Sequence, residues 1–160
     1  MQQTPIAREL VLVGGGHSHV ILLRMLGMQP VRGLQITLIS PDTRTPYSGM
    51  LPGLIAGHYD EDDIHIDLVP LCRFAGARFV QAAVCGLDTV MQTVQLEERP
   101  DIRYDVLSLD IGITPSLDNV MGARENVIPV KPINQFLQHW RSFQNRVATC
   151  LLYTSDAADE

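Results

Sequence analysis

The sequence predicts an α/β fold built around a parallel sheet, and three observations carry this prediction. An apolar, β-rich run at residues 10–13 leads directly into three glycines. Residues 20–28 are then continuously apolar except for Arg24, and residues 34–39 form a second β-rich run. A strand, a glycine turn, a helix and a strand within about 30 residues make a βαβ unit, which places its strands parallel with a right-handed crossover.

Length and composition fit about one globular domain. The chain has 160 residues, of which 46% are hydrophobic and 19% charged. Twelve basic residues against 18 acidic ones give a net charge of −6, which argues against a nucleic-acid partner. No apolar run approaches the roughly 20 residues of a membrane span. The three cysteines show no CxxC spacing, which argues against a disulfide scaffold or a zinc knuckle.

The remaining elements follow from local signals. Residues 40–59, rich in proline and glycine, are expected to form a long, functional loop without regular structure. Asp67 is expected to cap a helix over residues 68–75 that stops at Gly76. A third strand is expected over residues 78–87, a hairpin or meander over residues 90–111 that ends in another strand, and an amphipathic helix over residues 133–148.

The glycine turn is the main functional signal. Gly14 and Gly16 form half of a dinucleotide-binding fingerprint, in which one glycine permits the tight turn and the next lets the backbone approach a pyrophosphate at the positive end of the helix. The third position of that fingerprint holds His19 instead of glycine or alanine. The alternative is a turn that only packs the helix on the strand. The strand before and the helix after favour nucleotide binding.

Polar residues near the turn admit more than one interpretation. Ser40 ends the second strand, where an acid usually binds a ribose, and Asp42 either takes that role or only starts the next turn. Two histidines at i and i+2 do not share a helix face, which argues against a metal site. We therefore expect His17 and His19 to flank the pyrophosphate. Because His19 stands where the fingerprint has a small residue, we expect the helix to lie slightly further from the strand. His65 is interpreted as structural. Cys72 and Cys85 are expected to be buried free thiols, and the apolar stripe at 133–143 is expected to be core.

Four segments resemble a known family in the same order along the chain. They are GGGHSHV at 14–20, LISPD at 38–42, TPYSGMLPGL at 45–54 and YDVLSLDIG at 104–112. The chain resembles the start of the FAD-dependent pyridine nucleotide–disulfide oxidoreductase superfamily, near type II NADH dehydrogenases and sulfide–quinone reductases. The nearest subgroup is the flavoprotein domain that is often fused to selenide, water dikinase.

This resemblance implies a Rossmann-like FAD-binding domain with an added β-hairpin or meander, and it implies roles for particular residues. The pyrophosphate would lie at the glycine turn and the first helical residues, the ribose at the end of the second strand, the flavin ring at the following loop and the adenine at the third strand. The usual Ala-Thr-Gly after the later strand is replaced by residues 110–112, which keep the glycine and lose the threonine hydroxyl. The implied cofactor-binding residues are Gly14, Gly15, Gly16, His17, Ser18, Ser40, Pro41, Asp42, Tyr47, Ser48, Gly49, Met50, Ala83, Val84, Asp110 and Gly112.

The resemblance also implies an activity. A nicotinamide, NADH or NADPH, would reduce the FAD, which would pass electrons to an acceptor such as a quinone. The family's CxxxxC pair is absent, which disfavours a thiol relay, and no catalytic residue is assigned. A stand-alone NAD(P)-binding module without flavin chemistry and a non-catalytic interaction domain are the alternatives. The implied location is cytoplasmic, with peripheral contact to the inner face of the membrane and a fused selenide, water dikinase domain as further possibilities.

The expected organisation has three parts. Residues 1–130 form the N-terminal part of an incomplete FAD-binding domain, and residues 131–149 form a helix toward a missing NAD(P)-binding domain. Residues 150–160, CLLYTSDAADE, match the translation of a transposase-type sequencing adapter. We therefore expect this tail to be an artefact, the alternative being a genuine polar C-terminus.

Overall fold

A computed structural model describes residues 6–156, with side chains up to residue 150. The chain divides into two compact units, one up to Gly112 and the other from Ile113 onward. The three expected parts, 1–130, 131–149 and 150–160, stay predictions. Each unit is described by itself.

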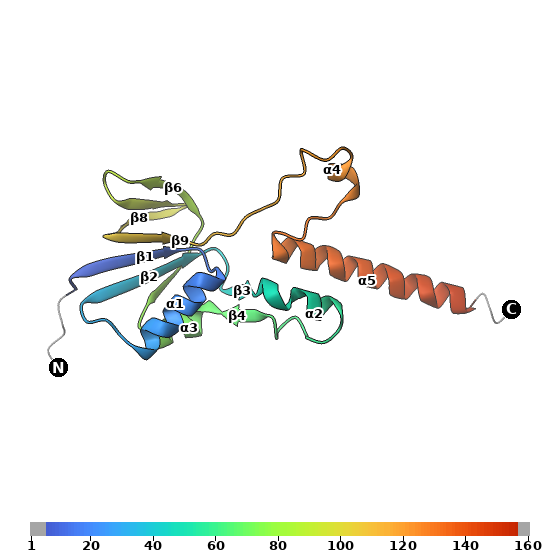
Figure 1. The fold of residues 1–160 in the computed structure, drawn as a ribbon, viewed down its shortest axis with the longest axis horizontal. Coiled ribbons are helices and arrows are strands. Elements are labelled where there is room, and N and C mark those ends of the chain that lie inside the picture. The colour runs from blue at the N-terminus through green and yellow to red at the C-terminus, as the bar shows by residue number, and fades with distance from the viewer. Residues whose placement is uncertain (1–5, 157–160) are drawn as a thin grey trace. The chain divides into compact units, whose positions relative to one another are not determined.

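A four-stranded parallel sheet forms the centre of the first unit, in the order β5-β2-β1-β9 (Figure 1). The strands are β1 (Arg8–Val13), β2 (Leu34–Ser40), β5 (Arg78–Gln81) and β9 (Val106–Leu109). Two helices, α1 (His17–Met28) and α3 (Leu68–Ala75), cover one face. The α/β class, the βαβ unit and the parallel sheet predicted from the sequence are confirmed.

Both faces of β1 are buried, which explains its unbroken apolar run. Leu12 packs on the helix side with Leu23 of α1 and Leu68 of α3. Val11 and Val13 point to the opposite face, because side chains alternate along a strand. Each face of the sheet therefore has its own apolar core.

A three-stranded antiparallel meander covers the second face of the sheet. It consists of β6 (Val84–Asp88), β7 (Thr93–Leu96) and β8 (Arg99–Arg103), and its Val94 and Leu96 pack on β1. The expected meander is confirmed, but the single strand predicted over residues 78–87 is wrong. The chain leaves the parallel sheet after Gln81 and enters the meander at Val84, so that run belongs to two sheets.

The segment between β2 and α3 is more regular than predicted. It contains the antiparallel pair β3 (Arg44–Pro46) and β4 (His65–Asp67), the 3-10 turn η1 (Ser48–Met50) and the short helix α2 (Leu51–Ile55). Arg44 of β3 forms ion pairs with two carboxylates. Its guanidinium nitrogens lie 2.9 Å from Oδ1 of Asp62 and 3.3 Å from Oδ1 of Asp67, which is in β4. Asp67 therefore pairs with Arg44 and makes no side-chain cap on α3, although α3 begins and ends where predicted, with Gly76 in the left-handed conformation.

The second unit contains the short helix α4 (Ala123–Asn126) and the long helix α5 (Ile133–Asp156). The α5 helix begins where predicted and continues past residue 148, into the tail expected to be an artefact; residues 157–160 of that tail lie outside the described part. Leu137 is buried, whereas Phe143 is 45% exposed and stacks on Trp140 with ring centroids 5.7 Å apart. Only the first part of the predicted apolar stripe is therefore core.

Candidate nucleotide-binding site

The predicted site residues converge at one edge of the parallel sheet. Gly14 follows β1, Ser40 ends β2 and Asp110 follows β9, and the carboxyl ends of parallel strands share one edge. The chain runs from β1 to β2 on one side and returns as β9 on the other. This reversal at β1 is the position at which open α/β sheets bind ligands.

The glycines at 14–16 are required by close packing. Gly14 has a φ of +95°, and its N–H donates to the Ile39 carbonyl at 2.8 Å. A Cβ at Gly14 would overlap the backbone carbonyl of Asp110, and one at Gly15 would lie 2.6 Å from Cδ1 of Leu68. The turn is therefore held against β9 on one side and against α3 on the other.

The first turn of α1 presents backbone donors to the edge of the sheet. The N–H groups of Gly15, Gly16 and His17 have no acceptor among the described residues. The next two, of Ser18 and His19, donate to one carboxylate oxygen of Asp110 at 2.9 and 3.3 Å. Three neighbouring free donors at the positive end of a helix suit an anionic group.

His19 differs from its predicted role. Its side chain is 2% exposed and is not available to a ligand. Nδ1 lies 2.7 Å from the Gly14 carbonyl oxygen and Nε2 lies 2.9 Å from the Ser108 hydroxyl. Because a carbonyl only accepts, Nδ1 donates there, and Nε2 shares a hydrogen bond with the Ser108 hydroxyl, which can donate or accept. The ring thus links the glycine turn to β9. Sequence reasoning missed Ser108, which carries no local signal.

His17 brings a second segment to the site. Its ring stacks on Tyr47 with centroids 4.4 Å apart and planes inclined by 20°. The N–H of Tyr47 donates to the Ile64 carbonyl at 2.7 Å, which anchors the segment beside the β3–β4 pair. A Cβ at Gly49 would lie 2.8 Å from the Tyr47 ring, so η1 also packs on this tyrosine. The structure thereby places the loop residues Tyr47, Ser48, Gly49 and Met50 near the start of α1.

The ribose and adenine candidates lie beyond the ends of β2 and β5. Ser40 is buried, and its Oγ would be 3.4 Å from a Cβ at Gly15, so it adjoins the turn. Pro41 accepts a hydrogen bond from the Gln81 amide, and Asp42 is exposed. The Ala83 carbonyl accepts from Glu97 of the meander at 3.0 Å, while Val84 starts β6. Gly112 has a φ of +75° with open space around it, so no close packing requires it.

The other histidine and cysteines lie away from the turn. His65 holds the Glu61 carbonyl through Nδ1, as expected of a structural residue. Burial raises the pKa of the Cys72 thiol to about 11. Cys85 is exposed on β6, so its predicted burial is wrong. Within residues 6–156, His, Cys, Asp and Glu side chains form no group of three suited to a metal, and no helix is long and apolar enough to cross a membrane.

Comparison with curated proteins gives one relevant relative. No family model matches the chain. The NADH dehydrogenase-like protein YutJ of Bacillus subtilis is 27% identical over 144 residues, an alignment that covers 86% of this chain and 38% of that protein. The chain therefore spans less than two fifths of this relative.

Solved structures share the fold. The sulfide:quinone oxidoreductase of Aquifex aeolicus superposes with a TM-score of 0.71 at 25% identity, covering 89% of this chain and 33% of that one. NDH2 of Plasmodium falciparum, in complex with NADH, gives 0.70 at 17% identity, covering 90% and 30%. Together with the glycine turn at the end of β1 and the meander before β9, the likeness to YutJ and to the sulfide:quinone oxidoreductase supports the FAD-dependent pyridine nucleotide–disulfide oxidoreductase superfamily, in its type II NADH dehydrogenase-like branch.

Proposed function

We propose that this chain supplies the FAD-binding sheet of a flavin-dependent NAD(P)H oxidoreductase. The observation that carries the proposal is the start of α1, where the amides of Gly15, Gly16 and His17 have no acceptor within residues 6–156. They lie where the strand order reverses, beside β1. A dinucleotide pyrophosphate has the charge and the acceptor atoms that such a site needs.

The surrounding residues fit the rest of FAD. Ser40, Pro41 and Asp42 would hold the adenosine ribose, and Ala83 and Val84 would meet the adenine through their backbone. Tyr47 and the turn Ser48–Met50 would face the flavin, with Asp110 and Gly112 closing the site beside β9. Bound FAD would supply hydride and electron transfer, while the chain binds and orients it.

The reductant and the acceptor are proposed from the relatives. One similar structure is named a sulfide:quinone oxidoreductase, and another contains NADH. We therefore propose NADH or NADPH as electron donor and a quinone as acceptor. Because the chain spans only about a third of these proteins, the complete reaction belongs to the proposal. The peripheral membrane contact and the fused selenide, water dikinase domain stay predictions.

Separate titrations with FAD and NADH test this function, followed by flavin fluorescence and by calorimetry. FAD binding supports the proposal. Binding of NADH without FAD would overturn it in favour of a stand-alone NAD(P)-binding module. Binding of neither would favour a non-catalytic interaction domain.

A pair of variants tests whether the α1 amides hold the pyrophosphate. Proline is well tolerated at the first helical position, and Gly16 before it has extended backbone (φ −66°, ψ 168°), so His17→Pro removes the N–H while keeping the helix. His17→Ala removes the same ring but keeps the N–H. We expect His17→Pro to bind FAD about tenfold more weakly than His17→Ala, the scale of one charge-assisted hydrogen bond. Equal affinities would contradict this use of the amide.

A further inference from the structure

The Asp110 carboxylate lies at the positive end of α1. The Asp110 backbone N–H donates to the Val13 carbonyl at 2.8 Å, which fixes the residue beside β1. Its Oδ2 accepts from the Ser18 and His19 amides at 2.9 and 3.3 Å. A residue 92 positions away from Ser18 therefore caps this helix, whose own N-cap, Gly16, has no side chain to do so.

The same carboxylate fills the space that Gly16 leaves. A Cβ at Gly16 would overlap all three atoms of the Asp110 carboxyl group. The second glycine of the fingerprint was expected to make room for a pyrophosphate. On the β9 side, this chain uses that room for its own anion.

Two anions at one helix end repel each other. A carboxylate there stabilises the helix by neutralising part of its positive end, and a pyrophosphate at the neighbouring amides would gain less from the same dipole. Their direct repulsion over a few ångströms adds to this cost. Asp110 therefore stabilises the turn and opposes any phosphate that binds to it.

We propose that Asp110 is a specificity-determining residue that competes with phosphate anions for the start of α1. Small phosphates can bind only to the backbone amides at the start of α1, so repulsion by Asp110 keeps their affinity low. A dinucleotide overcomes the repulsion through its additional contacts along the ends of β2 and β5. The proposal deepens the proposed function and rests on it for the identity of the dinucleotide.

Asp110→Asn tests the proposal, because the amide oxygen can still accept from Ser18 and His19 while the charge is lost. We expect inorganic pyrophosphate, measured by calorimetry, to bind the variant about tenfold more tightly than the wild-type chain, and FAD to gain in the same direction. The gain in affinity shrinks as salt is raised from about 0.01 to 0.3 M, because screening weakens charge repulsion. A purely structural cap would show no such salt dependence.

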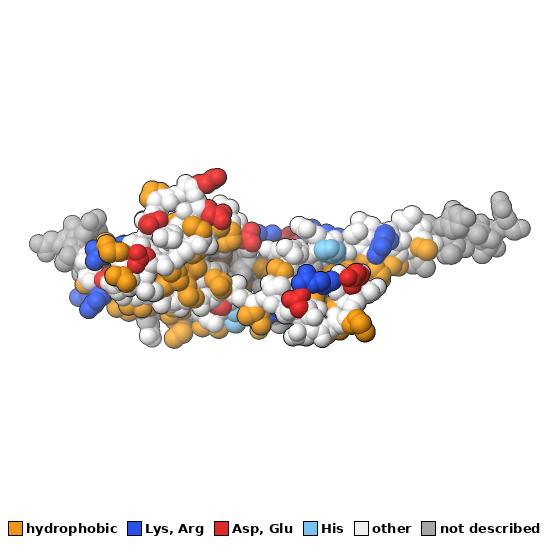
Figure 2. Space-filling view, turned by 90° about the horizontal axis from the view of Figure 1, so that it is seen from above, with side chains coloured by type: hydrophobic (Ala, Val, Ile, Leu, Met, Phe, Trp, Pro, Cys, Tyr) orange, Lys and Arg blue, Asp and Glu red, His pale blue; other side chains and the backbone are white. Residues whose placement is uncertain are grey.

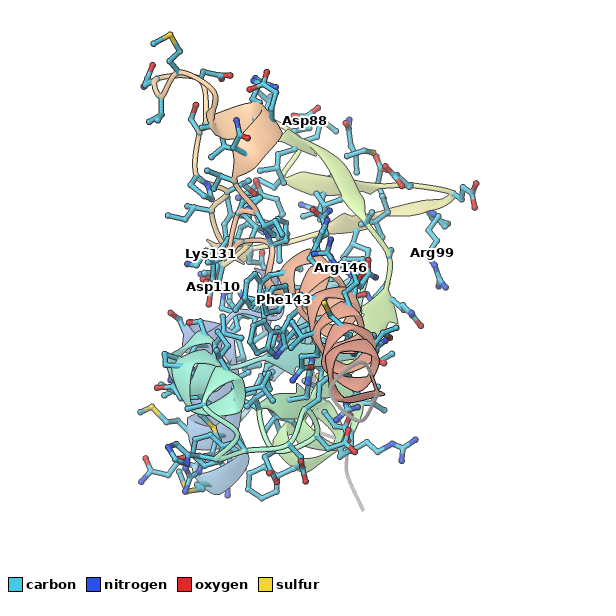
Figure 3. The ribbon with its side chains drawn as sticks, turned by 90° about the vertical axis from the view of Figure 1, so that its right-hand side faces the viewer. Asp88, Arg99, Asp110, Lys131, Phe143 and Arg146 are labelled. Carbon is cyan, nitrogen blue, oxygen red and sulfur yellow. The ribbon has the colours of Figure 1, made fainter. Side chains whose placement is uncertain are left out.

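Asp105→Asn is the matched control. Asp105 also caps a backbone N–H, that of Glu9 at 2.7 Å, but it precedes β9 and lies at the opposite edge of the sheet, about 17 Å away at 3.3 Å per residue. Asp88, which accepts from Val90 and Met91 in the β6–β7 turn, is likewise distant from Asp110 (Figure 3). Removing the charge of Asp105 is expected to leave pyrophosphate affinity unchanged within about twofold.

The outcomes separate the two proposals. Pyrophosphate affinity of Asp110→Asn that is equal to or lower than wild type overturns the role of Asp110, as does an equal gain in Asp105→Asn. If Asp110→Asn fails to fold by circular dichroism, Asp110→Ser, whose uncharged hydroxyl can still accept a hydrogen bond, is measured in its place by the same criteria. If Asp110→Asn binds pyrophosphate more tightly than the wild type but neither the wild type nor the variants bind FAD, the role of Asp110 is kept and the proposed function is overturned.

Discussion

At the scale of single residues, His19 connects parts of the site that are distant in sequence. It binds the Gly14 carbonyl five residues before it and the Ser108 hydroxyl 89 residues after it, with almost no exposure to solvent. A buried imidazole with both nitrogens satisfied rigidifies its surroundings, and its removal leaves two polar groups without partners.

We expect His19→Ala to lower the free energy of unfolding by about 2–4 kcal/mol, from lost packing and the unpaired Gly14 carbonyl. Ser108→Ala removes only one of the two hydrogen bonds and is expected to cost about 1 kcal/mol. Urea unfolding followed by circular dichroism measures both. His139→Ala is the control: His139 also binds a backbone carbonyl, of Gln135, but it is exposed and is expected to change stability by less than about 0.5 kcal/mol. A His19→Ala effect as small as the control's would contradict the bridging role.

Some of the site was predictable from sequence and some was not. The neighbouring positions of Gly14, Gly16 and Ser40 could be predicted because a strand, a turn and a helix are local in sequence, and the end of β2 must adjoin the turn after β1. The Asp110 cap could not be found in this way, because its partners are about 90 residues distant. The stacking of His17 on Tyr47 also depends on tertiary structure, since β3 and η1 bring Tyr47 to α1.

At the scale of elements, β1, α1, β2 and α3 were predicted nearly to their ends because their apolar spacing and their turn glycines are local signals. Residues 78–87 were not, since the run is mostly apolar, with only Arg78 and Gln81 as exceptions, and what changes along it is the strand with which it pairs. Val80 pairs with Ile39 of the parallel sheet, whereas Val84 pairs with Leu96 of the meander. Hydropathy gives no indication of such a change of sheet.

The burial of Cys72 in α3 predicts that this thiol reacts slowly. Cys72 packs in the core on the helix side of the sheet, and its burial raises the thiol pKa to about 11, so roughly one thiol in a thousand is ionised at pH 8. Cys85 is exposed. We expect iodoacetamide to alkylate Cys85 rapidly in the folded protein and Cys72 only after unfolding, with peptide mass spectrometry as the measurement. Rapid alkylation of both in the folded state would contradict the burial of Cys72.

The same shift in pKa predicts a dependence of stability on pH. Because the folded state holds the Cys72 proton more tightly than the unfolded state, the contribution of this thiol is complete below about pH 9 and is lost as the pH rises toward 11. Unfolding in urea at several pH values tests this, with Cys72→Ala as the control that removes the thiol. Between pH 9 and 11, the free energy of unfolding should fall by more in the wild-type chain than in Cys72→Ala. Equal declines would contradict the expectation.

At the scale of the whole molecule, the second unit begins with a largely exposed segment of chain. From Ile113 to the start of α5 the only regular element is α4. Ile113 is 75% exposed, and Met121 is fully exposed. On the face in Figure 2, apolar side chains are visible among scattered charges.

Limited proteolysis tests this division. Thermolysin cleaves before apolar residues, so we expect its first cuts among residues 113–122 and a persistent product that contains residues 6–112, identified by mass spectrometry. The exposed Val90 and Met91 of the β6–β7 turn serve as internal controls, because their backbone amides are bound by Asp88. First cuts within the parallel sheet would contradict the division.

The position of β9 has a consequence for the order of assembly during synthesis. Leu10 of β1 pairs with Ile36 of β2, 26 residues later, but its other neighbour is Val106 of β9, 96 residues later. At about 5–20 residues per second, the ribosome delivers β9 roughly 4–14 seconds after β2. During that interval one edge of β1 is open to strands of other chains. Ser108 and Asp110 are synthesised with β9, so the glycine turn and the start of α1 gain their hydrogen bonds to these residues late. A cofactor would therefore find an ordered binding site only after β9 has joined the sheet.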